Sequence, residues 1–181
     1  MLVLDETGNV DYAKMRQFMY DKTLKEYSRL GFSFHEITQS DAAAADKWNQ
    51  SDPKKKVRWK WEKQYAIYKK QHPERFDIAI EYEGDLCALC YGRIEGNGLV
   101  LSIDFLERNS LIRPKADNDK YIKIFGIVYF AAIVYAEPFG IEEFQIQNPD
   151  GDLIEYYSGY GFLTAEKIGN KVLYLSKKIK P

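Results

Sequence analysis

The sequence predicts an α/β domain of the α+β type. Apolar residues recur mainly with helical spacing up to residue 75, the pattern becomes extended from Phe76, and helical and extended segments alternate after residue 120. At 181 residues the chain has the length of one domain, and it can bury roughly 70% of the surface that its unfolded form exposes. Short polar breaks containing glycine separate three consecutive extended segments in the middle of the chain, which indicates antiparallel strands joined by tight turns.

The first 50 residues predict a helix, a strand and a second helix. Asp11 to Leu30 has an apolar stripe, with Asp11 suited to cap the start and Gly31 to end the helix. Phe32 to Ile37 alternates and predicts the first strand. Ser40-Asp41 is typical of a helix start, and Ala42 to Asn49 supplies good helix formers.

The segment Lys54 to Arg75 carries nine Lys or Arg against two Glu, interleaved with aromatic residues. Its apolar residues fall at helical spacing and predict the core-facing stripe of an ordinary helix beginning near Pro53. The stripe consists of Val57, Trp61, Tyr65 and Tyr68. Trp59 lies off the stripe, so a surface that recognises an acidic macromolecule and a wall of a substrate cleft both stay open as alternatives.

The remainder of the chain reads as six more strands and two helices. The strands are expected at Phe76 to Tyr82, Leu86 to Ile94, Leu99 to Leu106, Ile141 to Gln147, Phe162 to Ile168 and Val172 to Ile179. The helices are expected at Tyr121 to Tyr135 and Asp150 to Tyr160. The long break Glu107 to Asp119 precedes the first of these helices, and the turn Gly169-Asn170 joins the last two strands.

Composition excludes several classes of function. The formal net charge of -1 gives no global basic field for nucleic acid. Cys87 and Cys90 lie three apart in a strand-like run, where they should point to opposite faces, and no second ligand pair accompanies them; we expect two reduced thiols and no metal site. The longest apolar run, Ile124 to Ala136, is too short to span a bilayer, and no secretory signal pattern opens the sequence, so a cytoplasmic protein is expected.

The order of elements after residue 120 and the segment Tyr157-Ser158-Gly159-Tyr160-Gly161-Phe162 resemble the C-terminal half of the GCN5-related N-acetyltransferases, the GNAT superfamily. The resemblance covers roughly Phe32 to Ile179. It implies a mixed, mostly antiparallel sheet of about seven strands flanked by helices. Residues 1–31 would then be an N-terminal helical extension and residues 32–181 the GNAT-like domain, within one compact unit overall.

The resemblance implies transfer of an acetyl group from acetyl-CoA to an amine acceptor. In the family the fourth and fifth strands splay apart, and backbone groups in the gap bind the cofactor. Here Phe105, Leu106 and Glu107 would supply that backbone. Tyr157 corresponds to the tyrosine that protonates the departing thiolate. Asn148 corresponds to a cofactor-contacting asparagine, with Asp150 as a competing match.

This sequence departs from the family at the pyrophosphate loop, because no glycine lies between Gly98 and Gly126. The backbone amides of a helix beginning at Lys120, Tyr121, Ile122 and Lys123 would replace it, with charge from Lys120, Lys123 or Arg113. The alternative is a helix that Asp117 or Asp119 caps and that binds no phosphate.

The general base is left open between Asp104 and Glu107, with Glu81 and Glu83 as further alternatives. The acceptor is not identified: a small amine, a polypeptide and an RNA all stay open. The competing function is a binding or regulatory protein that keeps the fold without catalysis and recognises a macromolecular partner. An open cleft between the fourth and fifth strands would favour the enzyme, whereas a cleft filled by side chains would favour its rival.

Overall fold

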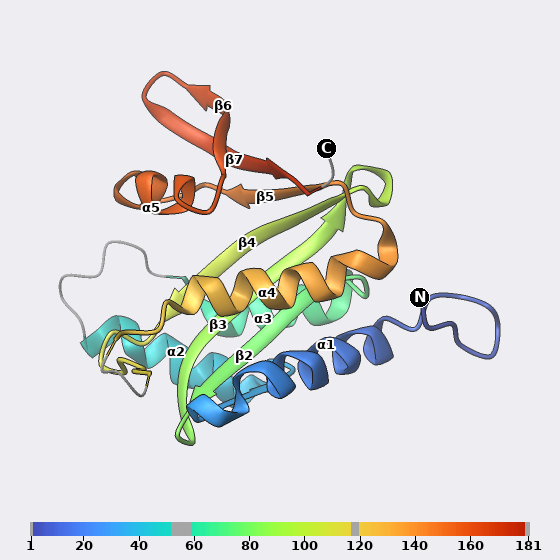
Figure 1. The fold of residues 1–181 in the computed structure, drawn as a ribbon, viewed down its shortest axis with the longest axis horizontal. Coiled ribbons are helices and arrows are strands. Elements are labelled where there is room, and N and C mark those ends of the chain that lie inside the picture. Colours follow the sequence, from blue (N-terminus) through green and yellow to red (C-terminus); the bar gives the residue numbers. More distant parts are fainter. Residues whose placement is uncertain (1, 52–58, 117–119, 180–181) are drawn as a thin grey trace.

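A computed structural model describes residues 2–51, 59–116 and 120–179 of the chain. Within these residues, seven strands form one sheet in the order β1-β2-β3-β4-β5-β7-β6, with helices on both of its faces (Figure 1). The strands are β1 (Phe32–His35), β2 (Phe76–Tyr82), β3 (Asp85–Glu95), β4 (Val100–Arg108), β5 (Glu143–Gln147), β6 (Leu163–Ile168) and β7 (Lys171–Lys178). The longer helices are α1 (Tyr12–Tyr27), α2 (Gln39–Ser51), α3 (Trp61–Gln71), α4 (Ile124–Ala136) and α5 (Ile154–Ser158). The expected mixed, mostly antiparallel sheet is confirmed.

The pairing of β4 with β5 is parallel, whereas every other neighbouring pair in the sheet is antiparallel. This parallel ladder begins at Val100 opposite Glu143 and ends at Ile103 opposite Ile146. β4 continues to Arg108 on β3 alone. The two strands therefore separate halfway along β4, which confirms the expected splay.

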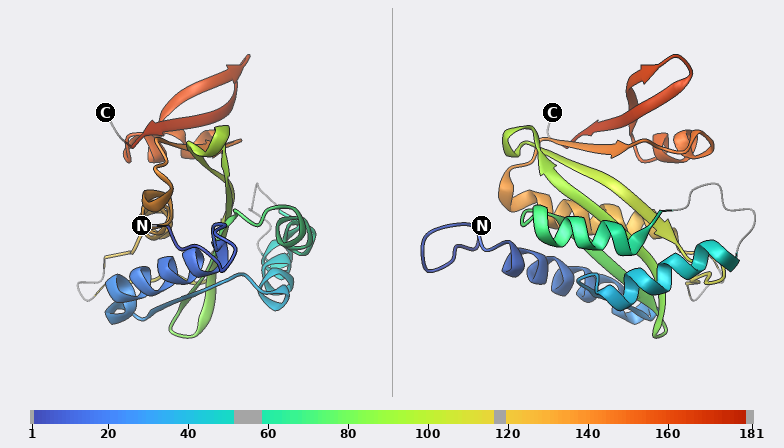
Figure 2. Two further views of the ribbon diagram at one scale, coloured as in Figure 1. Left: turned by 90° about the vertical axis from the view of Figure 1, so that its right-hand side faces the viewer. Right: turned by 180° about the vertical axis from the view of Figure 1, so that it is seen from behind.

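Two hydrophobic clusters hold the helices on the sheet. Figure 2 shows α1 and α4 on one face and α2 and α3 on the other. The larger cluster joins Met15 and Met19 of α1 to Val128 of α4 and to the sheet. α4 is apolar on nearly all sides because the sheet, α1 and the C-terminal segment surround it. The smaller cluster packs Trp61 and Tyr68 of α3 against the opposite face of β3.

The N-terminal segment shares the larger cluster with the rest of the chain. α1 lies against α4 and β1, and its Tyr20 is buried with Met15 and Met19. This packing agrees with one compact unit overall. The division into an extension at 1–31 and a domain at 32–181 stays a prediction.

Three helices differ in extent from the sequence prediction. α3 begins at Trp61, and its expected start near Pro53, together with Val57, lies outside the described residues. Trp61 and Tyr68 are buried as the stripe predicts. α4 begins at Ile124 and not at Tyr121, because residues 120–122 pair in an extended bridge with residues 114–116. The segment expected as a helix from Asp150 is a turn of 3₁₀-helix followed by the short α5.

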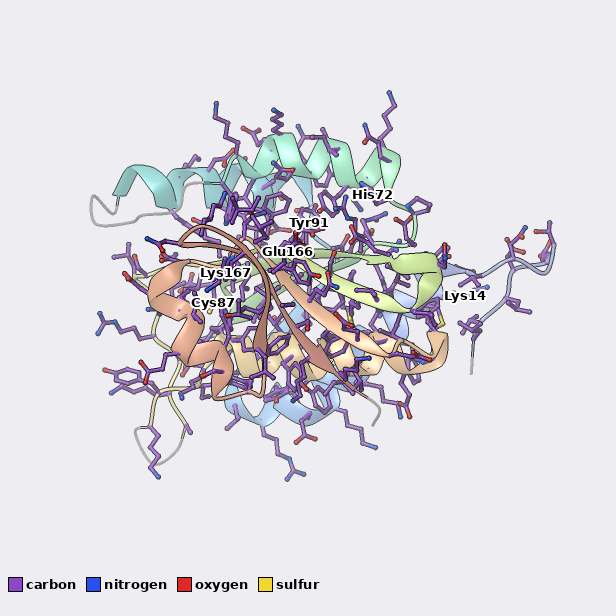
Figure 3. All side chains as sticks on the ribbon, turned by 90° about the horizontal axis from the view of Figure 1, so that it is seen from above. Lys14, His72, Cys87, Tyr91, Glu166 and Lys167 are labelled. Carbon is purple, nitrogen blue, oxygen red and sulfur yellow. The ribbon has the colours of Figure 1, made fainter. Side chains whose placement is uncertain are left out.

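The two cysteines do not point to opposite faces, so that expectation was wrong. Ala88 pairs with Ile80 and Leu86 with Glu81, which leaves Cys87 as the extra residue of a bulge. The bulge brings Cys87, which is labelled in Figure 3, into the same large cluster as Cys90. Both are free thiols and completely buried. Burial raises the pKa of the Cys87 thiol to about 11.

A second bulge shapes β4. Tyr91 pairs with Phe105 and Gly92 with Ile103, so Asp104 is the extra residue. Gly92 permits the close approach of the two strands, since a Cβ atom there would lie 2.2 Å from the carbonyl oxygen of Ser102. Asp104 lies on the face that carries α3, where it meets Tyr68, and the bulge brings the following residue, Phe105, to the same face.

Gly92→Ala is expected to lower the free energy of unfolding by about 1–3 kcal/mol, because the strands must move apart to accept the methyl group. Urea denaturation measures the change. Gly151→Ala is the matched control, since nothing lies within 4 Å of a Cβ atom at that position. Equal midpoints for the two variants would contradict this account of the bulge.

No helix among the described residues is long and apolar enough to cross a membrane. The described part of the chain also holds no group of three or more His, Cys, Asp or Glu side chains arranged to bind a metal ion.

Candidate active site

An open cleft of about 830 Å³ lies where β4 and β5 separate. Its walls come from the second half of β4, the residues after β5, the start of α4 and α5. Side chains leave this gap open, which is the condition set above for favouring an enzyme. The cleft brings together the sequence-predicted residues Asp104, Leu106, Glu107, Tyr121, Ile122, Lys123, Asn148 and Tyr157. Phe105 and Lys120 do not line it with their side chains.

The wall formed by β4 offers backbone groups to a ligand. Beyond Ile103, the described residues of β4 pair with β3 on one side and have no strand partner on the other. Leu106 and Glu107 also turn side chains toward the cleft. The ring of Phe105 packs instead against Trp59, with ring centroids 4.7 Å apart. An extended ligand with amide groups would find pairing partners along this edge.

Asp104 is a carboxylate on the cleft wall with only 7% of its side chain exposed. Ser102 Oγ donates a hydrogen bond to Oδ1 at 3.0 Å, and the hydroxyl of Tyr68 donates to Oδ2. Burial raises the pKa of Asp104 above its usual value, while the donated hydrogen bonds and Arg93 oppose the increase. The raised pKa makes the Asp104 carboxylate a stronger proton acceptor than an ordinary aspartate.

Glu107, the second candidate base, is also buried and lines the cleft. Its Oε2 accepts a hydrogen bond from Trp61 Nε1 at 2.7 Å. The two other candidates, Glu81 and Glu83, do not line the cleft; Glu81 accepts a hydrogen bond from Ser33 on β1 instead.

Tyr157 presents a phenol to the cleft from α5. Its ring packs edge-on against Phe125 of α4, with centroids 4.8 Å apart, and the residue is 7% exposed. Among the described residues its hydroxyl has no hydrogen-bond partner. Burial, with smaller contributions from Cys90 and Asp150, raises the pKa of Tyr157 to about 12. The phenol therefore keeps its proton at neutral pH and is available as a donor.

Tyr156 and Tyr160 pack against each other and against Phe125 of α4. Their hydroxyls lie 3.5 Å apart, and both rings stand edge-on to Phe125. Tyr160 also explains Gly126 in α4, because a Cβ atom there would lie 3.4 Å from the Tyr160 hydroxyl. The glycine thus faces the turn after α5.

Cationic side chains gather at another part of the cleft. Arg108, Arg113 and Lys123 line it beside the first turn of α4. Lys123 is the N-cap residue of α4, so the free first-turn amides belong to the helix that begins at Ile124 and not to Lys120 to Lys123 as expected. Asp117 and Asp119, the proposed capping residues, lie outside the described residues. A helix N-terminus with nearby cations favours a negatively charged group.

Asn148 follows β5 directly and lines the cleft. Its backbone is in the left-handed region, with φ of 45°, and its backbone N–H donates a hydrogen bond to the Leu173 carbonyl at 2.7 Å. Asp150, the competing match, also lines the cleft, but its carboxylate accepts from the backbone amide of Asp152 and so caps the following turn.

Sequence reasoning missed one feature of this site and kept a second only as an alternative. Tyr68 was assigned to the core by its helical spacing, yet its hydroxyl reaches Asp104, 36 residues away in the sequence. Trp59 was noticed only because it lies off the stripe, and it does line the cleft. That irregular spacing was the one signal available for it.

Comparison with solved structures identifies the fold. The chain superimposes on the ribosomal-protein-S18-alanine N-acetyltransferase of Escherichia coli with a TM-score of 0.58 and 12% identity, over 83% of this chain and 95% of that one. The PaiA N-acetyltransferase of Thermoplasma acidophilum, solved with coenzyme A, gives 0.54 and 12% over 81% and 98%. The putative acetyltransferase YncA of Salmonella typhimurium, solved with acetyl-CoA, gives 0.55 and 10% over 83% and 95%.

No protein-family model matches the sequence, and no curated protein matches it either. The structural neighbours are N-acetyltransferases of the GNAT family, and the chain has their fold, as the sequence resemblance implied.

Proposed function

We propose that this protein is an acetyl-CoA-dependent N-acetyltransferase that passes the acetyl group directly to an amine acceptor. The observation that carries the proposal is the open cleft between the diverging β4 and β5, with the protonated phenol of Tyr157 and the buried carboxylate of Asp104 both on its walls. Two structural neighbours were solved with coenzyme A or acetyl-CoA, which supports the same ligand here.

The residues of the cleft fit acetyl-CoA in two respects. The unpaired edge of β4 from Phe105 to Glu107 would hold the amides of the pantetheine arm, with Asn148 on the opposite wall. Arg113, Lys123 and the first turn of α4 would hold the pyrophosphate and replace the missing glycine loop. Tyr121 and Ile122 add apolar surface beside these cations.

Acetyl-CoA supplies the acetyl group as a thioester. The amine must lose a proton before it can attack, and we assign this step to Asp104, with Glu107 as the alternative base. Tyr157 donates its proton to the sulfur that leaves, and the raised pKa of the phenol keeps that proton on the phenol over the physiological pH range until the transfer. The open cleft disfavours the rival interpretation, a protein that keeps the fold only to bind a macromolecule, although the acidic partner proposed for Lys54 to Arg75 stays a separate prediction.

The substitute phosphate site yields a binding prediction. Combining Lys123→Ala with Arg113→Ala is expected to weaken acetyl-CoA binding about tenfold or more, because each charge-assisted contact contributes more than a neutral one. Isothermal titration calorimetry measures the affinity. Binding of S-acetylpantetheine, which lacks the pyrophosphate, should not change between the wild type and the double variant.

Lys171→Ala serves as the matched control, since Lys171 is an exposed cation on β7 that does not line the cleft. An equal loss of affinity in the control, or none in the double variant, would place the phosphate elsewhere.

Activity is tested by thiol release from acetyl-CoA in the presence of a panel of amines: small polyamines, aminoglycosides, and peptides with free N-termini or lysines. We expect at least one amine to accelerate release and to gain the mass of one acetyl group. Acetyl-CoA binding without acceleration by any class of amine would favour the rival function.

A further inference from the structure

Asp104 is held by side chains from its own strand and from α3. Ser102 Oγ donates to Oδ1 at 3.0 Å, and Tyr68 Oη donates to Oδ2. A carboxylate has about four lone-pair positions, so two remain for other partners. Because Asp104 lines the cleft, these donors restrict its rotation at the place where an acceptor amine would arrive.

Tyr68 is itself fixed by packing. Its ring stacks on Tyr91 with centroids 4.6 Å apart and meets Phe105 edge-on at 5.9 Å. Only 4% of the residue is exposed. Burial and the neighbouring Asp104 carboxylate both raise the pKa of Tyr68, so the phenol remains the donor and Asp104 the acceptor.

The other charged and titratable groups around Asp104 come from β3. Arg93 Nε lies 3.4 Å from Oδ2 and also pairs with Glu95, and the phenol of Tyr91 and the buried thiol of Cys90 are the titratable groups that precede Arg93 on this strand. Arg93 favours the charged carboxylate, and Glu95 opposes it. From α3, Tyr68 is the group that touches the carboxylate directly.

We propose that Tyr68 is the positioning residue of the general base, and that it holds the Asp104 carboxylate on the cleft wall as an oriented proton acceptor. The inference rests on the proposed function for its catalytic meaning. Asp104 takes one proton from the acceptor ammonium, and the freed lone pair forms the new C–N bond as the C–S bond breaks. Tyr157 gives its proton to the departing sulfur and regains one when the amide nitrogen loses its second proton, and Tyr68 keeps its own proton throughout.

The titration of Asp104 tests the structural half of this proposal without any substrate. Carboxyl ¹³C chemical shifts of the full chain are followed with pH, and Asp104→Asn assigns the signal. Tyr68→Phe removes a donor that favours the charged carboxylate, so the Asp104 titration should move to higher pH by about one pH unit or more. Tyr91→Phe is the control, because the Tyr91 hydroxyl is buried with no hydrogen-bond partner among the described residues. It should leave the titration where it is.

A second variant keeps the test valid if Tyr68→Phe does not fold. Incorporating 3-fluorotyrosine at position 68 retains the ring and makes the phenol a stronger donor, which should move the Asp104 titration to lower pH. An unmoved titration in the folded variants, or an equal shift in Tyr91→Phe, overturns the proposal.

The kinetic half uses thiol release from acetyl-CoA with 1,4-diaminobutane and a lysine-containing peptide as probes. In Tyr68→Phe the acid limb of the pH profile of kcat/KM should move to higher pH together with the Asp104 titration, while KM for acetyl-CoA stays the same. An acid limb that does not move overturns the positioning role. Absence of turnover in the wild type overturns the proposed function instead. The ¹³C titration needs no substrate, so it still shows whether Tyr68 stabilises the charged Asp104 carboxylate.

Discussion

Replacing Tyr157 by phenylalanine is expected to lower kcat for acetyl transfer about 100-fold or more, while the affinity for acetyl-CoA changes little. The substitution removes only the hydroxyl, so the edge-on contact of the ring with Phe125 remains. Loss of a general acid affects the transition state more than the bound ground state, which separates kcat from binding. Steady-state kinetics with an active amine and calorimetry with acetyl-CoA measure the two quantities.

The control for this variant is Tyr160→Phe. Tyr160 stands against the same Phe125 ring, but it does not line the cleft. Its kcat should stay within about threefold of the wild type. A similar small effect for Tyr157→Phe would remove Tyr157 from the mechanism.

The pH dependence of kcat follows from the pKa of Tyr157. The protonated phenol is the active form, and burial raises its pKa to about 12, so activity should be lost only as pH rises toward that value. The alkaline side of the profile is therefore expected to stay flat to about pH 10. A falling limb near pH 8 that Tyr157→Phe abolishes would contradict the raised pKa.

Asp77→Ala is expected to lower the free energy of unfolding by about 3–5 kcal/mol, the second large effect. Asp77 is completely buried on β2, where Arg75 Nε donates to Oδ2 and Tyr20 Oη to Oδ1, each at 2.7 Å. Removing the carboxylate leaves the guanidinium of Arg75, itself buried, with the partly exposed Glu36 as its remaining counter-charge, and it leaves the Tyr20 hydroxyl without its carboxylate acceptor. Urea denaturation followed by circular dichroism measures the loss.

Lys14→Ala provides the comparison for Asp77→Ala, because Lys14 pairs with Asp11 at 3.0 Å while 65% of its side chain is exposed (Figure 3). Exposed pairs contribute little to stability, so no measurable change is expected. Comparable losses in the two variants would show that burial does not set the cost of breaking the Asp77 pair.

The fold was predictable because its determinants are local. Strands such as β2 and β3 appear as apolar blocks separated by a glycine turn, and α4 appears as a long apolar helix. The bulges were not predictable, because the position of the extra residue depends on how two neighbouring strands pair and not on the sequence of one strand. This is why Cys87 and Cys90 share a face and why Phe105 faces α3 together with Asp104.

The candidate site was predictable in part. Tyr157 and the edge of β4 follow from the order of elements and from the resemblance to GNAT proteins. The start of α4 was placed three residues too early, since an isolated bridge between Lys115 and Tyr121 draws the preceding residues into an extended form. The contact of Tyr68 with Asp104 needs the packing of α3 on the sheet, which no spacing in the sequence reveals.

The most direct test of the central claim is calorimetric titration of the purified protein with acetyl-CoA. We predict saturable binding of one molecule per chain, tighter than that of S-acetylpantetheine because the cations beside α4 contact the pyrophosphate. Absence of binding at millimolar acetyl-CoA would contradict the account and leave the cleft between β4 and β5 without its proposed ligand.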